Sequence, residues 1–506
     1  MLRRTQQYTI EQFMQTTLVS TISFSHDEKS ILVSSNQTGI FNAFTITIDN
    51  GAMRQVTYST DEDIRAVSCF PCDGRILYAK DTGGIESRHL WVANEDGTHT
   101  AITDGAGSKG GFRRWTRDGK YFYCVTNERD ARYFDVYKID TSSYQRTLLF
   151  EGNRDDIFSD ISNDENYAVF VRANSNSDVD IYLYDRHKQS MQNLTPHEGD
   201  RSFLPIHLDL ASRYLYYTAL LGNDSSALYR YELATGKTEK LEQFTGPLCS
   251  TRFSYSEKYR VMLKSKGGRL KIEVYDSETG QKVELPRFPY GGDIKSIEIS
   301  NSERLMAFYV NGDRSPNDLY VYDFVTGQLH KLTNNLNAEI DPKDLVESDE
   351  VSFKSFDGLE IPCLLWKPHD ASVDCKAPAL VWVHGGPSGQ IKKGYAGAIQ
   401  FLVNHGYVIL GVNYRGSLGY GEEFAAAADR RQGREPLWDC VEAKRYLATL
   451  DYVDSKNIGI IGGSFGGYMV LAALTFHPEE FTVGVDIAGK SNWIRALESL
   501  PPDSLS

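Results

Sequence analysis

The chain has 506 residues, 41% of them hydrophobic and 24% charged, which is the balance of a globular protein of two or three domains. Its net charge of −14 argues against nucleic acid as a partner, because phosphate binding needs a basic surface. The sequence has no apolar run of about 18 residues and predicts no membrane span, and its seven scattered cysteines are typical of free thiols in a reducing, cytoplasmic setting.

The N-terminal part has few signals of its own. Two early arginines have no apolar run behind them, so we expect no signal peptide. We predict a short helix within residues 8–18, where Thr9 and Gln12 have the spacing of a capping box. Farther along, Cys69 and Cys72 have C-x-x-C spacing, but no second pair lies nearby. We therefore predict no metal and no cofactor.

A repeat with a spacing of 45 to 47 residues fills most of the chain. In each copy an apolar residue ends one strand, a polar turn follows, and a second strand begins. These apolar residues are Phe24, Phe70, Trp115, Ile161, Leu208, Phe253 and Ile299. Later in the copy an alternating strand leads into a glycine turn, as in residues 228–232 before Thr235-Gly236.

About four strands in each of seven copies predict a seven-bladed β-propeller, because one sheet buries its two faces only against neighbouring sheets. Stacked sandwich domains are the competing all-β fold, but they would not keep one phase through all copies. We place the propeller at residues 16–340, after an N-terminal helical segment at residues 1–15. Residues 335–342 are interpreted as a linker.

From residue 341 to residue 506 strands alternate with helices, which predicts a mainly parallel sheet. This part opens with a hairpin across Asp357-Gly358. The expected strands are 379–383, 407–412, 457–461 and 482–487, and the expected helices are 398–403, 437–447 and 467–476.

The turn Gly462-Gly463-Ser464-Phe465-Gly466-Gly467 joins an apolar strand to a helix. This is the context of a nucleophile elbow, in which the neighbours of the serine must lack side chains. We predict that Ser464 is a nucleophile whose hydroxyl lies at a helix N-terminus, where a developing anion is stabilised. A glycine-rich turn with an incidental serine is the alternative.

Two other loops follow strands of this sheet. The backbone of His384-Gly385-Gly386-Pro387 is suited to an oxyanion hole. We assign the oxyanion N–H groups to Gly386 and Phe465, with Gly385 as a further candidate, and a Gly-Pro turn without catalytic geometry is the alternative. In the second loop, we expect Arg415 to brace the site by ion pairing rather than to contact substrate.

A propeller, His384-Gly385-Gly386-Pro387, Asn413-Tyr414-Arg415-Gly416-Ser417 and the turn around Ser464, in that order, resemble the prolyl oligopeptidase family of serine peptidases. The chain looks most like its bacterial acylaminoacyl-peptidase and dipeptidyl-peptidase-like members. The resemblance covers the whole chain and implies an α/β-hydrolase domain at residues 341–506, capped by a propeller that admits short peptides. It also implies acyl transfer, in which Ser464 attacks a carbonyl, an acyl-enzyme forms and water releases it.

One departure concerns the catalytic triad. In α/β-hydrolases the acid and the histidine follow the nucleophile in the chain, and the candidates after Ser464 are His477, Asp486 and Asp503. We expect none of them to be a triad member, since His477 ends the elbow helix and Asp486 lies in a buried strand. We therefore interpret the sequence as C-terminally truncated, with an incomplete hydrolase domain and at most residual activity.

The sequence leaves two activities on short peptides open, that of an oligopeptidase and that of an acylaminoacyl-type exopeptidase. The dipeptidyl branch of the family implies a Glu-Glu pair in the propeller, but Glu422-Glu423 and Glu479-Glu480 lie in the hydrolase part. His384 stands where prolyl endopeptidases carry a tyrosine. The alternatives are an esterase with the same machinery and a propeller binding protein with a degenerate hydrolase remnant, and homo-oligomerisation is left open.

Overall fold

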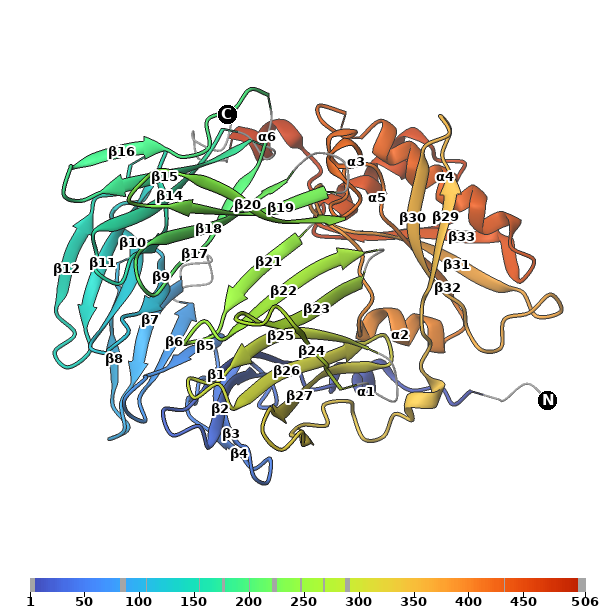
Figure 1. Cartoon of the computed structure of the whole chain (residues 1–506). Helices are drawn as coiled ribbons and strands as arrows, with labels where there is room; N and C mark the ends of the chain where they lie inside the picture. The colour runs from blue at the N-terminus through green and yellow to red at the C-terminus, as the bar shows by residue number, and fades with distance from the viewer. Residues whose placement is uncertain are drawn as a thin grey trace.

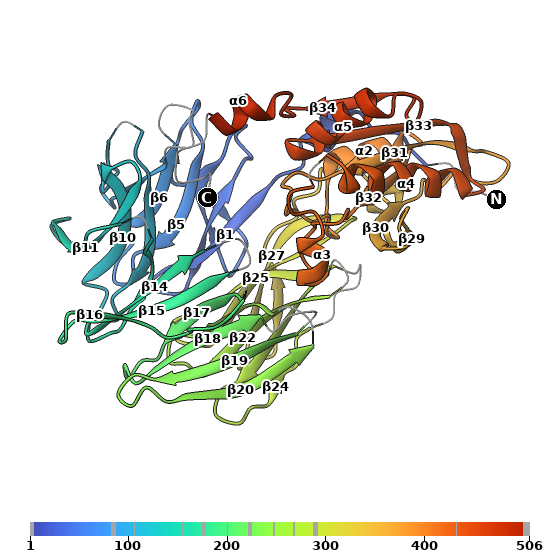
Figure 2. The ribbon, with the colours of Figure 1, turned by 90° about the horizontal axis from the view of Figure 1, so that it is seen from above.

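The computed structural model describes residues 5–498 apart from 82–87, 106, 154, 175–177, 200, 221–224, 246–247, 267–268, 287–291 and 432. Four-stranded antiparallel sheets form a ring, and a mixed sheet with helices on both faces lies beside it (Figure 1, Figure 2). Helix α1 (Ile10–Met14) precedes the ring, and Thr9 and Gln12 form the expected capping box. None of the described helices is long and apolar enough to cross a membrane.

Seven four-stranded sheets are present in the described part of the chain, and each is built from strands that are consecutive in sequence. The first three blades comprise β1 (Val19–Phe24), β2 (Ser30–Ser35), β3 (Asn42–Thr47), β4 (Met53–Gln55); β5 (Ile64–Cys69), β6 (Ile76–Asp81), β7 (Arg88–Ala93), β8 (His99–Ala101); β9 (Gly110–Trp115), β10 (Tyr121–Asp130), β11 (Tyr133–Asp140) and β12 (Arg146–Phe150). The next two comprise β13 (Ile157–Ile161), β14 (Tyr167–Ala173), β15 (Val179–Asp185), β16 (Ser190–Asn193); β17 (Phe203–Leu208), β18 (Tyr214–Leu220), β19 (Ser225–Glu232) and β20 (Thr238–Thr245). The last two comprise β21 (Leu248–Phe253), β22 (Tyr259–Lys266), β23 (Arg269–Asp276), β24 (Lys282–Val283); β25 (Asp293–Ile299), β26 (Leu305–Gly312), β27 (Ser315–Asp323) and β28 (Leu329–Lys331). The predicted seven-bladed propeller is confirmed.

The polar turns of the repeat connect neighbouring blades. The carboxylate of Glu303 in the seventh blade accepts hydrogen bonds from the Ser254 hydroxyl and the Ser256 backbone of the sixth, each at 2.6 Å. Glu28 in the first blade accepts from the Ser302 backbone N–H at 2.7 Å and from its hydroxyl at 2.5 Å. The first and seventh blades share no strand, so contacts of this kind, together with apolar packing between these blades, close the ring.

The second sheet has the strand order β29-β30-β32-β31-β33-β34, with parallel pairing from β32 to β34. Its strands are β29 (Asp349–Lys354), β30 (Glu360–Trp366), β31 (Ala377–Val383), β32 (Val408–Val412), β33 (Val453–Gly463) and β34 (Gly484–Ile487). The helices of this part are η1 (Pro342–Asp344), α2 (Gly397–Asn404), α3 (Glu422–Ala426), α4 (Glu435–Thr449), α5 (Phe465–Phe476) and α6 (Trp493–Glu498). Apolar side chains of α2 pack on one face of the sheet and those of α4 and α5 on the other, which is the predicted α/β-hydrolase architecture.

Polar contacts fasten the seventh blade to the hydrolase part. Asp313, in the turn between β26 and β27, accepts hydrogen bonds from the Ser348 N–H at 2.7 Å and the Gly394 N–H at 3.0 Å. The Gln400 amide of α2 donates to the Asp313 carbonyl at 2.9 Å and to the Val346 carbonyl at 2.8 Å. These buried groups pair fully with one another, so the junction holds the two parts in one orientation on this side.

Candidate active site

Ser464 lies at the turn between β33 and α5, as the sequence predicted. Its backbone has φ 56° and ψ −116°, a strained conformation that costs of order 1–3 kcal/mol in a residue with a side chain. Its side chain is exposed and makes no capping hydrogen bond to the helix. A Cβ on Gly462 would lie 2.9 Å from the Val383 carbonyl oxygen, and one on Gly466 would lie 2.9 Å from that of His384. The two glycines let the elbow approach the preceding loop closely.

The loop after β31 borders the elbow directly. A Cβ on Gly385 would lie 3.4 Å from the Cβ and 3.9 Å from the Oγ of Ser464. Gly386 has φ 139°, and a Cβ there would lie 2.6 Å from the Ser388 nitrogen, so the loop needs glycine at this position. The structure thus brings the predicted nucleophile beside the loop that was predicted to hold an oxyanion.

Phe465 is the first residue of α5. Its N–H has no acceptor one turn back in the helix, so it is available at the helix N-terminus beside Ser464. Its buried ring packs among Tyr414, Tyr468 and Trp493, with ring centroids 5.6 to 6.1 Å away. This packing fixes the start of the helix, and with it the direction of the N–H.

His384 opens the oxyanion loop and is buried under Tyr414, with the two rings stacked at 4.3 Å. Its Nδ1 lies 2.7 Å from the Gly385 carbonyl oxygen and its Nε2 lies 2.8 Å from the Ser417 hydroxyl. Burial lowers the pKa of His384 to about 4, because no carboxylate compensates for desolvation of the cation. His384 is therefore a neutral imidazole at physiological pH.

Two family models match parts of the chain. Residues 394–500 match the model of the prolyl oligopeptidase family, and residues 112–270 match that of the dipeptidyl peptidase IV N-terminal region. Residues 394–500 therefore carry a domain of the prolyl oligopeptidase family. The second match lies in the propeller, so both parts of the chain are similar to parts of known peptidases.

Relatives in this family are peptidases. Dipeptidyl aminopeptidase BIII of Pseudoxanthomonas mexicana is 28% identical over 485 residues, covering 92% of this chain and 69% of the relative. The prolyl endopeptidase of Elizabethkingia meningoseptica is 21% identical over 405 residues, covering 75% of this chain and 55% of the relative. A puromycin-hydrolysing peptidase of Mycobacterium tuberculosis has the same fold, with a TM-score of 0.79 at 17% identity, covering 99% of this chain and 83% of that one. The chain is thus placed among peptide-bond hydrolases.

The described residues bring no histidine to Ser464 that would serve as a general base. His477 ends α5, a helix of 12 residues, and so lies about 18 Å along the axis from Ser464. Asp486 accepts a hydrogen bond from the Gly489 N–H at 2.8 Å, as expected for a structural residue, but it is exposed rather than buried because β34 is the edge strand. Asp503 lies outside the described residues.

Arg415 braces the loop that follows β32, as predicted. Its guanidinium donates to both carboxylate oxygens of Asp439, at 2.9 and 2.8 Å, and to both of Asp357, at 2.7 and 3.0 Å. The Asp439 side chain is fully buried and also accepts from the Ser355 hydroxyl at 2.6 Å. The ion pairs occupy the planar fork of the guanidinium, so Arg415 does not face a substrate.

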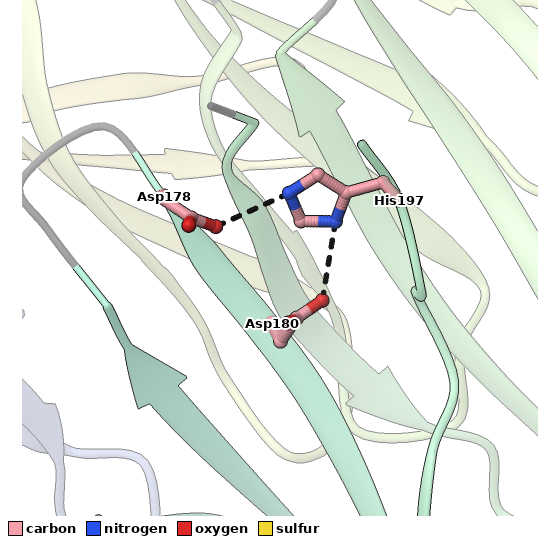
Figure 3. A group of neighbouring side chains, drawn as sticks. All are labelled: Asp178, Asp180 and His197. Carbon is pink, nitrogen blue, oxygen red and sulfur yellow. Dashed lines mark hydrogen bonds and ion pairs between the residues drawn. The ribbon is translucent and has the colours of Figure 1, made fainter. Parts of the chain in front are cut away.

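A cluster of Asp178, Asp180 and His197 is the one group among the described residues with the composition of a metal site. Figure 3 shows that the carboxylates approach different ring nitrogens, Asp178 at Nε2 (3.1 Å) and Asp180 at Nδ1 (3.3 Å). Nδ1 also lies 2.8 Å from the Thr195 carbonyl oxygen, and these contacts raise the pKa of His197. Oxygen atoms already engage both ring nitrogens, so the geometry fits an ion-pair role for the cluster.

Sequence reasoning missed the residues that support His384. Tyr414 and Ser417 stand in the same five-residue stretch that was singled out for Arg415, and both are fully buried. No local signal in the sequence distinguished these two residues from the rest of the loop. What the sequence did not supply is that this loop packs against the loop after β31.

Proposed function

We propose that the chain is a serine-type peptidase acting on short peptides, with Ser464 as the nucleophile and the N–H groups of Gly386 and Phe465 as the oxyanion hole. The observation that carries the proposal is the strained, exposed Ser464 between a helix N-terminus and the Gly385-Gly386 backbone. Strain of this kind persists only where the surrounding structure enforces it, and it clusters at active sites.

The proposed reaction is acyl transfer. The Ser464 Oγ attacks the carbonyl carbon of the scissile peptide bond, and the carbonyl oxygen takes up negative charge and accepts hydrogen bonds from the two N–H groups. Collapse of this intermediate expels the amine and leaves an ester on Oγ, and attack by water on the ester releases the acid. No described histidine reaches Ser464 to take its proton, so we expect residues 1–506 alone to turn over at a residual level.

The substrate class we propose is short peptides, cleaved by an oligopeptidase or by an exopeptidase that removes acylated amino acids. The propeller sequence contains no Glu-Glu pair. In the hydrolase part, Glu480 of the pair Glu479-Glu480 is engaged by Lys444 at 2.8 Å and by Arg445 at 3.0 Å. Glu480 is thus held by two cations of α4, and this lowers the case for a dipeptidyl activity, although the relative dipeptidyl aminopeptidase BIII bears a dipeptidyl name.

A second candidate is a propeller binding protein that retains an inactive hydrolase part. It is favoured by one observation, the absence of a base for Ser464 among the described residues. An esterase with the same machinery makes the same acyl-enzyme and differs only in the leaving group. The net charge of −14 opposes nucleic acid as a partner in each case.

The test compares kcat/KM on three substrates, an N-acetyl-alanine anilide, an unblocked dipeptide anilide and a short acyl ester. We expect the acetylated substrate to be cleaved most efficiently, and cleavage to be lost in Ser464→Ala. Ser455→Ala, an exposed serine near the other end of β33, is the matched control and should behave as the parent. Preference for the dipeptide anilide would overturn the substrate class, and turnover unchanged in Ser464→Ala would overturn the nucleophile.

A further inference from the structure

The hydrogen bonds around His384 form a chain that ends at the predicted oxyanion loop. Ser417 begins it, with its Oγ 2.8 Å from His384 Nε2 and 2.6 Å from the Tyr414 carbonyl oxygen. His384 Nδ1 then lies 2.7 Å from the Gly385 carbonyl oxygen. The neutral imidazole carries one proton and the serine hydroxyl another for these three close contacts, while the Tyr414 hydroxyl, 3.3 Å from Nδ1, also has the His384 and Pro387 carbonyl oxygens as acceptors at 3.2 Å.

Two arrangements of the protons are available. In the first, the Ser417 hydroxyl donates to Nε2, and the ring proton on Nδ1 donates to the Gly385 carbonyl. In the second, the Ser417 hydroxyl donates to the Tyr414 carbonyl, Nε2–H donates to Ser417, and the lone pair of Nδ1 faces the lone pairs of the Gly385 oxygen. The tautomer of His384 therefore depends on the direction in which one serine hydroxyl points.

The first arrangement is favoured by what the neighbouring groups already have. The Tyr414 carbonyl accepts the Ser417 backbone N–H at 3.0 Å and also lies 2.6 Å from the Ser417 Oγ, so in the first arrangement the serine proton is shared between this carbonyl and His384 Nε2. The Gly385 carbonyl receives its close donor only from Nδ1–H. A lone pair held 2.7 Å from a carbonyl oxygen in a buried site is repulsive, and the low local dielectric increases that cost.

The Gly385 carbonyl matters because it shares a peptide group with the Gly386 N–H. A trans peptide is planar, and its C=O and N–H point in opposite directions. A donor that holds the carbonyl therefore also fixes the direction of the N–H. Gly386 has φ 139°, a conformation open to glycine that leaves this peptide free to rotate unless something holds it.

We propose that Ser417 is a positioning residue for the oxyanion hole, whose hydroxyl donates to His384 Nε2, keeps the ring proton on Nδ1 and so holds the Gly385-Gly386 peptide with its N–H toward the oxyanion of Ser464. The stacked Tyr414 ring keeps the imidazole in the plane that this bond requires. The catalytic part of this inference rests on the proposed function, while the tautomer does not.

The direct test is ¹⁵N NMR of the protein labelled at histidine, which distinguishes the protonated from the unprotonated ring nitrogen. His384 is assigned among the 11 histidines by its loss in His384→Asn and by the absence of titration between pH 5.5 and 8. We expect the Nδ1–H tautomer in the parent chain. A parent chain with the proton on Nε2 overturns the proposal without any further variant.

Variants then test the role of the serine. Ser417→Ala removes the donor to Nε2, and we expect the ring proton to move to Nε2 or to exchange between the two nitrogens. Ser417→Thr keeps a hydroxyl and should restore the Nδ1–H tautomer. Ser355→Ala is the matched control, because it also removes a buried serine hydroxyl from this region but one that donates to Asp439. An unchanged Nδ1–H tautomer in Ser417→Ala contradicts the proposal.

Kinetics separate this inference from the function on which it rests. Loss of one oxyanion donor lowers kcat by about 10²–10³-fold, and a donor that is only misaligned costs less. We expect Ser417→Ala to lower kcat about 10- to 100-fold with little change in KM. Ser355→Ala should leave kcat/KM as in the parent. An unchanged kcat with a shifted tautomer would overturn the positioning role. No Ser464-dependent turnover in the parent would overturn the function and leave the tautomer result standing.

Discussion

Two histidines, the half-buried His197 in the propeller and the buried His384 in the hydrolase part, have opposite electrostatic environments. His197 in the propeller has carboxylates on both ring nitrogens, at 3.1 and 3.3 Å, and its pKa is raised. His384 in the hydrolase part has a carbonyl and a hydroxyl on its ring nitrogens, at 2.7 and 2.8 Å, and its pKa falls to about 4. Both rings are surrounded by oxygen atoms at similar distances.

The difference shows that burial and hydrogen-bond partners together set the pKa of a histidine, because desolvation lowers the pKa of His384 while the Thr195 carbonyl and two carboxylates raise that of His197. In the propeller the contacts favour the cationic form of the ring and tie a strand to the segment after its neighbour, which is a structural task. In the hydrolase part the ring must stay neutral so that one nitrogen donates and the other accepts. Substitutions and pH changes should therefore act in opposite directions at the two sites.

The largest expected effect extends the comparison to a buried cation with two carboxylate partners. Arg415→Met leaves Asp439 buried without its counter-charge, and we expect a loss of about 3–5 kcal/mol in the free energy of unfolding. Arg431→Met is the control, since the Arg431 side chain precedes α4, is 61% exposed and pairs with Glu435 at 2.9 Å, so its loss should cost under about 1 kcal/mol. Urea unfolding followed by tryptophan fluorescence measures the free energy of unfolding of both variants. Equal losses in the two variants would show that a buried partner charge does not determine the cost of removing the cation.

The free energy of unfolding at acidic pH tests whether the His384 ring is held neutral. Its folded pKa of about 4 lies below the unfolded value near 6.5, so the unfolded chain binds the proton first. Its contribution is fully present above about pH 6.5 and falls as the pH drops toward 4, by roughly 3 kcal/mol in total. The difference in unfolding free energy between the parent and His384→Asn should shrink over that range. A constant difference for His384→Asn would mean that the ring is not held neutral.

The change in stability as the pH rises tests His197, and we expect it to be the smallest of these effects. Its folded pKa lies above the unfolded value, so its contribution is fully present below about pH 6.5 and is lost as the pH rises through the raised pKa. Each unit by which the pKa is raised is worth about 1.4 kcal/mol. The melting temperature of His197→Gln should therefore lie farthest below that of the parent near pH 6 and approach it toward pH 9. A gap that widens with pH would reverse the assignment of charge.

Much of the fold followed from local patterns in the sequence. The regular spacing of apolar strand ends predicted the blades, and the hairpin at Asp357-Gly358 joins β29 to β30 as expected. The domain limits at residues 15, 340 and 341 stay predictions. The short helices α3 and α6 were not anticipated, since five or six residues carry too little periodicity to be recognised.

Only part of the candidate site could be predicted from local sequence patterns. Ser464 and the two glycine-rich turns follow from strand, turn and helix signals that are local in sequence. The tautomer of His384 depends on Ser417, 33 residues away, and Arg415 is neutralised by Asp357, 58 residues away. Contacts of that separation come from the packing of loops at the ends of parallel strands, which no local pattern encodes. Asp486 was expected to be buried for the same reason, because the sequence did not reveal that β34 lies at the sheet edge.

The central claim is that Ser464 is the nucleophile of a peptidase site. The most direct test exposes the protein, purified as its gene encodes it, to a fluorophosphonate probe and locates the adduct by peptide mass spectrometry. We expect a single adduct on Ser464, absent in Ser464→Ala and unchanged in Ser455→Ala. No adduct on Ser464 after prolonged exposure, or an adduct on another residue that survives Ser464→Ala, would contradict the account.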